Sequence, residues 1–128
     1  MSITIKTEQS PVEQLLSQSY SVVYTSSIYD SDVLIYRLKT KTTAEWNSNK
    51  QVRILSNIKT YEYKRAGWLI YQYGPYPNPK YWTWTSGETL VFRQIQIWNT
   101  LKDYTHQIKV YGYNKGVFVC TTYSYSGR

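Results

Sequence analysis

Residue types that build common functional sites are scarce in this 128-residue chain. It contains one cysteine, Cys120, and one histidine, His106. A lone cysteine cannot form a disulfide within the chain or a CxxC metal site, and one imidazole falls short of the three or four ligands that zinc takes. The sequence therefore predicts neither a structural disulfide nor a metal site.

Long apolar runs are also missing. The strongest apolar stretches, Val33–Tyr36 and Val117–Cys120, are four residues long, where a membrane-spanning helix needs about 20. The first residues, Met1–Lys6, have neither the basic nor the apolar region of a signal peptide. We therefore expect a soluble protein without a membrane span, located in the cytoplasm or in a virion.

Catalytic motifs are equally scarce. The six glycines form no phosphate-binding loop, and no serine lies in a GxSxG elbow. A triad could combine a serine with His106 and Asp103, but a lone histidine on a strand is usually structural. Asp30 and Asp32 lie in a tight turn, where aspartate is favoured because its side chain bonds the local backbone. We expect a non-enzymatic protein with no catalytic residue and no cofactor.

Aromatic and basic residues are abundant. The chain has 15 Tyr, 5 Trp and 2 Phe, and its 15 Lys plus Arg against 8 Asp plus Glu give a net charge of +7. Residues 1–43 carry four basic and four acidic side chains, so the whole excess lies in residues 44–128 (11 minus 4). Together with 41% hydrophobic residues, this composition predicts one ordered domain over residues 1–128.

One helix is predicted, near the N-terminus. Ser10 is a favoured N-cap, Pro11 suits the first helical position, and Glu13 completes a capping box. We expect a short helix over residues 11–19, packed on a sheet through Val12, Leu15 and Leu16. The segment Thr42–Glu45 repeats the capping-box spacing, and we expect at most one helical turn there.

The remaining segments are rich in Val, Ile, Thr and aromatic residues, a composition typical of strands. Turn residues divide them into hairpins, with tips at Asp30–Asp32, Lys64–Gly67, Ser86–Gly87, Leu101–Asp103 and Asn114–Gly116. Gly116 suits the left-handed position of a three-residue loop. Because its alternate prolines cannot donate ladder bonds, Gly74–Pro79 should be an extended surface loop. The sequence predicts a mainly β fold, an antiparallel barrel or strongly curved sheet of about eight strands.

Two of these strands share a pattern at an offset of 50 residues. Side chains alternate along a strand, so each pattern places two tyrosines and two cations on one side. The residues are Lys59, Tyr61, Tyr63 and Arg65 in the first strand, and Lys109, Tyr111, Tyr113 and Lys115 in the second. The repetition fits a duplicated hairpin, and it also fits chance recurrence in a tyrosine-rich chain.

If the two strands shared one exposed face, bases could stack on its tyrosines while its cations held phosphates. We therefore predict binding of a polyanion, single-stranded nucleic acid first, by these eight residues. The same pattern can simply stabilise a sheet, because tyrosine pairs pack across strands and lysine protects exposed edges. Two further alternatives are a self-assembling coat or surface subunit and a carbohydrate-binding module that uses Trp82 and Trp84.

Overall fold

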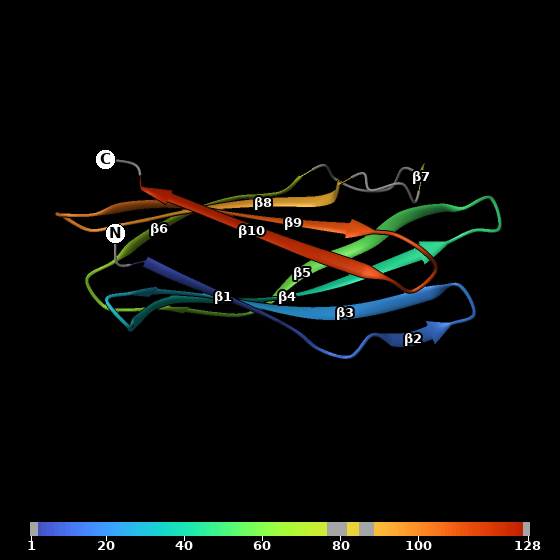
Figure 1. Cartoon of the computed structure of the whole chain (residues 1–128), viewed down its shortest axis with the longest axis horizontal. Helices are drawn as coiled ribbons and strands as arrows, with labels where there is room; N and C mark the ends of the chain where they lie inside the picture. The colour runs from blue at the N-terminus through green and yellow to red at the C-terminus, as the bar shows by residue number, and fades with distance from the viewer. Residues whose placement is uncertain (1–2, 77–81, 85–88, 127–128) are drawn as a thin grey trace.

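Alternation of buried and exposed side chains is the main determinant of this fold. In the segment 33–46, Leu38, Thr40, Thr42 and Ala44 are buried, whereas the residues between them reach solvent. A strand with one buried face must pack that face against a second layer. The chain meets this need with two antiparallel sheets packed face to face (Figure 1). This computed structural model describes residues 3–76, 82–84 and 89–126.

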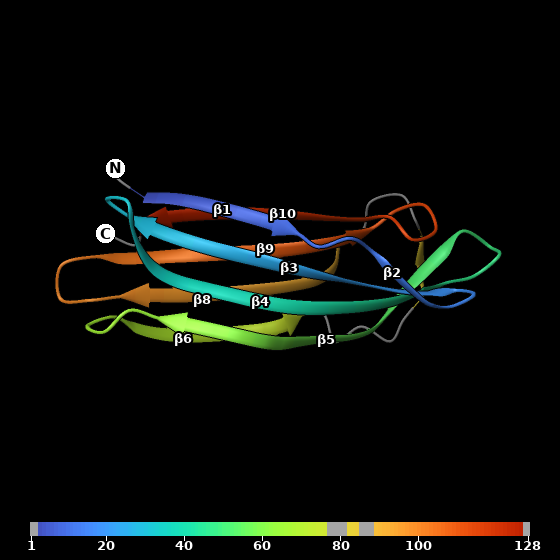
Figure 2. The same cartoon turned by 90° about the horizontal axis from the view of Figure 1, so that it is seen from below.

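The larger sheet, sheet A, has the strand order β1-β3-β4-β5-β7, and β2 also pairs with β3 (Figure 2). Its strands are β1 (Ile3–Gln9), β2 (Glu13–Leu16), β3 (Ser19–Asp30), β4 (Val33–Trp46), β5 (Gln51–Lys64) and β7 (Thr83–Trp84). Sheet B has the order β10-β9-β8-β6. Its strands are β6 (Leu69–Tyr76), β8 (Thr89–Trp98), β9 (Asp103–Gly112) and β10 (Phe118–Ser126).

The space between the sheets holds two apolar clusters. One includes Trp46, Val52 and Phe118, and the other includes Ile28, Tyr36 and Ile97. Along their strands the two clusters are separated by buried polar residues: Ser26, Thr40, Thr42, Asn57 and Arg93. Asn57 links two of them: its Nδ2 donates to Thr42 Oγ1, and Arg93 Nε donates across the sandwich to its Oδ1, each at 2.7 Å. The interior therefore has a polar belt between two apolar halves.

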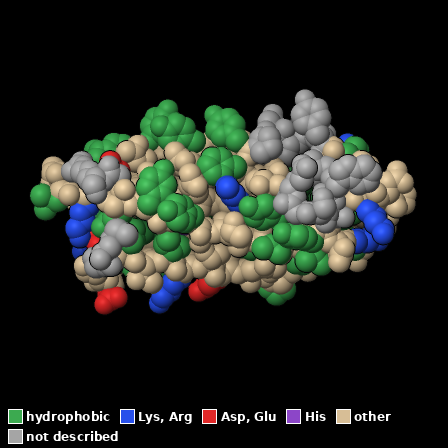
Figure 3. Space-filling view, turned by 45° about the horizontal axis from the view of Figure 1, so that its top comes forward, with side chains coloured by type: hydrophobic (Ala, Val, Ile, Leu, Met, Phe, Trp, Pro, Cys, Tyr) green, Lys and Arg blue, Asp and Glu red, His purple; other side chains and the backbone are tan. Residues whose placement is uncertain are grey.

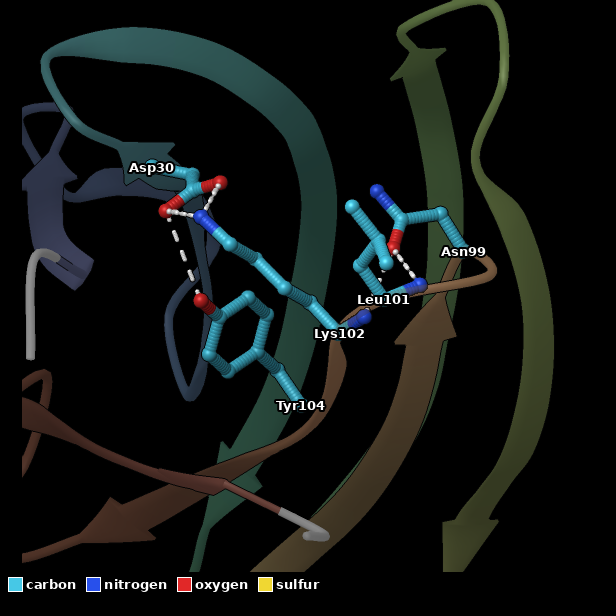
Figure 4. A network of polar contacts seen from close by, with 5 residues as sticks. All are labelled: Asp30, Asn99, Leu101, Lys102 and Tyr104. Atoms are coloured by element: carbon cyan, nitrogen blue, oxygen red, sulfur yellow. Dashed lines mark hydrogen bonds and ion pairs between the residues drawn. The ribbon is translucent and has the colours of Figure 1, made fainter.

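A polar contact ties the two sheets together at one end of the sandwich (Figure 4). Lys102, which follows β8, places its Nζ 2.7 Å from Asp30 Oδ2 at the end of β3. Tyr104 donates its hydroxyl to the same carboxylate at 3.4 Å. The Lys102 turn is closed by Asn99, whose Oδ1 accepts from the backbone N–H groups of Leu101 and Lys102. The turns at Asp30–Asp32 and Leu101–Asp103 are thus confirmed as hairpin tips.

The predicted helix over residues 11–19 is wrong. Both groups that would cap it are used by β3 instead: Ser10 N donates to Val23 O, and Ser10 Oγ accepts from Val23 N, each at 2.9 Å. The chain then forms the short strand β2, which pairs with the start of β3. Leu15 and Leu16 are exposed, so they cover no sheet. At Thr42–Glu45, where at most one helical turn was expected, the structure has none, because β4 continues through the segment to Trp46.

The predicted barrel and two of the predicted hairpins are wrong as well. The sheets stay separate, and residues 65–68 carry the chain from β5 in sheet A to β6 in sheet B. This crossing places the Trp68 indole in the core, stacked on Tyr104 at 6.1 Å. Likewise, β7 pairs with β5 rather than with β8. The tip expected at Ser86–Gly87 lies outside the described residues.

The hairpin at Asn114–Gly116 is confirmed, and Gly116 has the expected positive φ of 77°. Gly74 to Tyr76, the first half of the predicted extended loop, belong instead to β6, and the second half lies outside the described residues. Pro75 is tolerated there since β6 is an edge strand with a bulge between Tyr73 and Tyr76. Gly74 has a φ of 99°, and a Cβ on it would lie 2.6 Å from Phe92 O. Within the described residues, no helix has the length and hydropathy to span a membrane.

Candidate functional site

The two tyrosine-bearing strands of the sequence prediction lie in different sheets. Tyr61 and Tyr63 belong to β5 of sheet A, whereas Lys109 and Tyr111 belong to β9 of sheet B. The sheets pack through their inner faces, so the outer side chains of β5 and β9 point in opposite directions. The prediction that these residues share one face is therefore wrong.

A β-bulge in β5 also separates residues that simple alternation would group. Tyr61 pairs with Lys39, whereas Lys59 pairs with the buried Thr40, so Thr60 is the extra residue. Lys59 consequently turns to the inner side of the sheet, where its Nζ lies 3.3 Å from Glu62 Oε1. The carboxylate of Glu62 also accepts from the buried Tyr36 hydroxyl at 2.8 Å. Lys59 therefore pairs with a partly buried acid on the inner side of the sheet instead of lying beside Tyr61 on the outer side.

The remaining predicted cations lie near the ends of the sandwich. Arg65 follows β5 and is exposed, with its backbone N–H bound to Ile35 O. Lys115 lies in the β9–β10 loop and lines a hollow of about 170 Å³ with Trp46, Lys50 and Asn114. Tyr113 follows β9, with its ring centre 6.4 Å from that of Tyr111. Of the eight predicted residues, Tyr61 and Tyr63 alone lie on the outer face of sheet A within a strand.

That outer face nevertheless carries cations and tyrosines in adjacent rows. Strand register places Lys6, Ser27, Arg37 and Tyr63 side by side, and Glu8, Thr25, Lys39 and Tyr61 in the next row. A third row contains Lys41, and Tyr29 lies at the end of β3 beside the first. We call this surface the basic face: Lys6, Tyr29, Arg37, Lys39, Lys41, Tyr61 and Tyr63.

Direct contacts join the cations and rings of the basic face. Lys6 Nζ lies 5.1 Å from the ring centre of Tyr29, and Lys39 Nζ lies 5.7 Å from that of Tyr61. Arg37 is held by the Ser27 hydroxyl at 2.8 Å and by the Tyr29 hydroxyl at 3.2 Å. Cation–π contacts of this kind attract a cation to the face of a ring. The face thus presents fixed positive charge next to partly exposed π-surfaces.

Most cations of the basic face come from the part of the chain that has no net charge. Lys6, Arg37, Lys39 and Lys41 are all four basic residues of the segment 1–43. Of the four acids of this segment, Glu8 and Glu13 lie on the same side of the sheet, and Asp30 and Asp32 lie at the tip between β3 and β4. The spacing of residues 37, 39 and 41 at intervals of two was visible in the sequence. The net charge of the segment 1–43 is zero, and this sum hid the row of cations. Side chains alternate between the two faces of a strand, so a segment without net charge can still have a charged face.

The lone histidine, His106, connects the two sheets inside the sandwich. His106 is fully buried, with Nε2 2.7 Å from Ser26 Oγ in the opposite sheet and Nδ1 2.8 Å from Ser124 Oγ. Asp103 does not approach the imidazole but accepts from Gln96. Burial lowers the pKa of His106 to about 4. The imidazole is therefore neutral at physiological pH and joins the two sheets.

Other candidate groups are also in structural positions. Burial raises the pKa of the Cys120 thiol to about 12, and its side chain packs on both core clusters. Trp82 lies under the Arg53 guanidinium at 4.5 Å, while the side chain of Trp84 is outside the described residues. In the part of the chain that the structure describes, no three His, Cys, Asp or Glu side chains gather as a metal site.

Searches of protein-family models, curated proteins and solved structures returned no match to this chain.

Proposed function

We propose that this protein binds polyanions without catalysis, single-stranded nucleic acid first, and that the basic face is the binding surface. The observation that carries the proposal is the placement of Lys6, Arg37, Lys39 and Lys41 beside three tyrosine rings on adjacent rows of one sheet. Cations that contact phosphates supply affinity, and rings that accept stacked bases of any sequence hold a single strand.

The geometry of the rows favours an extended single strand over a duplex. Tyr61 and Tyr63 are two residues apart on β5, so their side chains emerge roughly 6.8 Å apart along the strand. Tyr61 is 46% exposed. A base must be unpaired and splayed to lie on such a ring, whereas a duplex offers only its backbone.

The acids near the basic face leave its charge largely intact. Glu45 is engaged by Arg53, with an Nη2 to Oε1 distance of 2.9 Å. Glu8, in the row of Lys39, and Glu13, which pairs with Ser21 on β3, are the other acids of this outer face among the described residues. The four cations therefore outnumber the two remaining acids, which is the condition for phosphate attraction.

A salt titration tests the proposal. With four cations on phosphates, log K for oligo-dT should fall against log salt with a slope of about −3, taking roughly 0.7 per contact. The double variant Lys39→Gln with Lys41→Gln should lower the magnitude of the slope to about 1.4 by the same arithmetic. Lys109→Gln on sheet B is the matched control and should leave the slope unchanged. A flat slope for the wild type, or equal effects of both variants, would refute the assignment.

Self-assembly through sheet edges stays an alternative prediction. Its support is β2, a four-residue edge strand whose residues are all exposed, with Leu16 at 73%. Such an edge can pair with another chain unless it is covered.

A further inference from the structure

The outer face of sheet B has a different composition, which the polyanion proposal leaves unused. Its two edge strands each carry a row of tyrosines. Figure 3 shows hydrophobic side chains gathered on this side of the molecule. We call it the tyrosine face. The two rows are Tyr71, Tyr73 and Tyr76 on β6, and Tyr123 and Tyr125 on β10.

Glutamine and threonine side chains lie between the two rows. Register places Tyr123, Gln107, Gln94 and Tyr73 side by side, and Tyr125, Thr105, Gln96 and Tyr71 in the next row. Gln107 Nε2 donates to Gln94 Oε1 at 3.0 Å, which orients both amides. Three strand spacings separate β6 from β10, a width of roughly 14 Å.

A hollow lies on the β10 side of this surface. Its volume is about 320 Å³, and its lining is Gln107, Lys109, Tyr111, Thr121, Thr122 and Tyr123. The lining offers rings, an amide, two hydroxyls and one ammonium, and it contains no acid. The hollow is at the small end of the volume range of ligand sites.

We infer that the tyrosine face binds a glycan, with one sugar unit in this hollow and its ring against Tyr123. A pyranose has an apolar C–H face and a rim of hydroxyls, so it needs an exposed ring beside amide and hydroxyl groups. Tyr123 is 60% exposed and Tyr125 38%, with ring centres 5.6 Å apart. Tyrosine supplies such contact area with little loss of conformational entropy. This site is distinct from the basic face and does not depend on the polyanion proposal.

The same composition disfavours other occupants. A nucleic acid strand would meet one cation, Lys109, which lies over the Phe92 ring at 5.9 Å. A second copy of the chain would have to bury the glutamine and threonine groups between the tyrosine rows, and each amide left without a partner costs free energy. A sugar avoids this cost because its hydroxyls replace the water on those groups.

A glycan titration tests the inference. The probes are hexasaccharides of β-1,3-glucan, β-1,4-glucan and chitin as neutral chains, and oligogalacturonate as an acidic chain, each titrated to millimolar concentration by calorimetry. We expect binding of at least one probe and a loss of about tenfold or more with Tyr123→Ala, equivalent to 1.4 kcal/mol. Tyr61→Ala, an exposed tyrosine on sheet A, is the matched control and should have no effect.

Lys109→Gln separates the two kinds of glycan. If the sugar unit is acidic, this variant should weaken oligogalacturonate binding and leave neutral probes unchanged; if it is neutral, neither changes. Absence of binding to all four probes overturns the inference, as does equal binding by Tyr123→Ala and wild type. Concentration-dependent dimerisation that Tyr123→Ala abolishes would also overturn it, because a second copy would then be the occupant. Thermal melts of each variant verify that the exposed substitutions leave the fold intact.

Discussion

The two outer faces of the sandwich are made by the same alternation and differ mainly in charge. Among the described residues, the outer face of sheet A has five cations and three acids, whereas that of sheet B has Lys109 and Asp103. Tyrosines occur on both faces. The comparison teaches that the ring supplies contact area in each case, and that the neighbours of the ring decide which ligand it suits.

The interior shared by the two faces explains how they can differ so much. Buried side chains supply the apolar contacts, and cross-sheet hydrogen bonds fix the sheets relative to each other. Outward positions are then free to vary without loss of the core. A substitution that unfolds the core should therefore abolish ligand binding by both faces, whereas a substitution of an outward side chain should change binding by one face only.

The largest expected effect follows from His106 and acts on both faces. Its pKa is about 4 in the folded chain and 6.5 in the unfolded chain, so between these values the unfolded chain binds the proton and the folded chain does not. Its contribution is fully present above pH 6.5 and is lost as pH falls towards 4. The loss amounts to roughly 3 kcal/mol of unfolding free energy.

Urea unfolding at pH 7 and pH 4.5 measures this effect. The carboxylates titrate in the same range, so the quantity to compare is the pH-dependent loss in wild type minus that in His106→Gln. The variant is expected to be less stable at pH 7 and to lose less on acidification. An equal loss in both proteins would show that the imidazole is accessible to protons in the folded state.

A matched pair of ring substitutions tests the separation of the faces directly. Tyr61→Ala should weaken oligo-dT binding by about 1 to 3 kcal/mol, a roughly fivefold to 140-fold change, because one stacking platform is lost. Tyr123→Ala should leave oligo-dT binding unchanged. Fluorescence anisotropy at fixed salt measures both, and a similar loss for the two variants would contradict the assignment of nucleic acid to one face.

The sequence was sufficient to predict the strands and several turns but not their pairing in sheets. Strand composition and the turns at Asp30–Asp32 and Asn114–Gly116 are local signals, and both were interpreted correctly. The capping box at Ser10 is a local signal too, but it was misleading. The backbone N–H and the hydroxyl of Ser10 form hydrogen bonds with Val23 of β3 instead of capping a helix. The crossing at residues 65–68 depends on burying Trp68 between sheets, which no local pattern reveals.

The candidate site shows the same limit at the level of single side chains. Tyr61 and Tyr63 were found because they alternate within an uninterrupted run. Lys59 was misplaced because the bulge at Thr60 moves it to the opposite side of β5. Bulges depend on the partner strand, so a single-strand pattern cannot place the residues beyond them.

The smallest expected effect is a null result that tests this bulge. Lys59→Gln should change the salt slope of oligo-dT binding far less than Lys39→Gln, although the two lysines come from paired strands with similar exposure. Lys39 faces the ligand, whereas the Lys59 ammonium is held 3.3 Å from Glu62 on the inner side. An equal reduction of about 0.7 in both slopes would place Lys59 on the basic face and show that β5 pairs without the bulge.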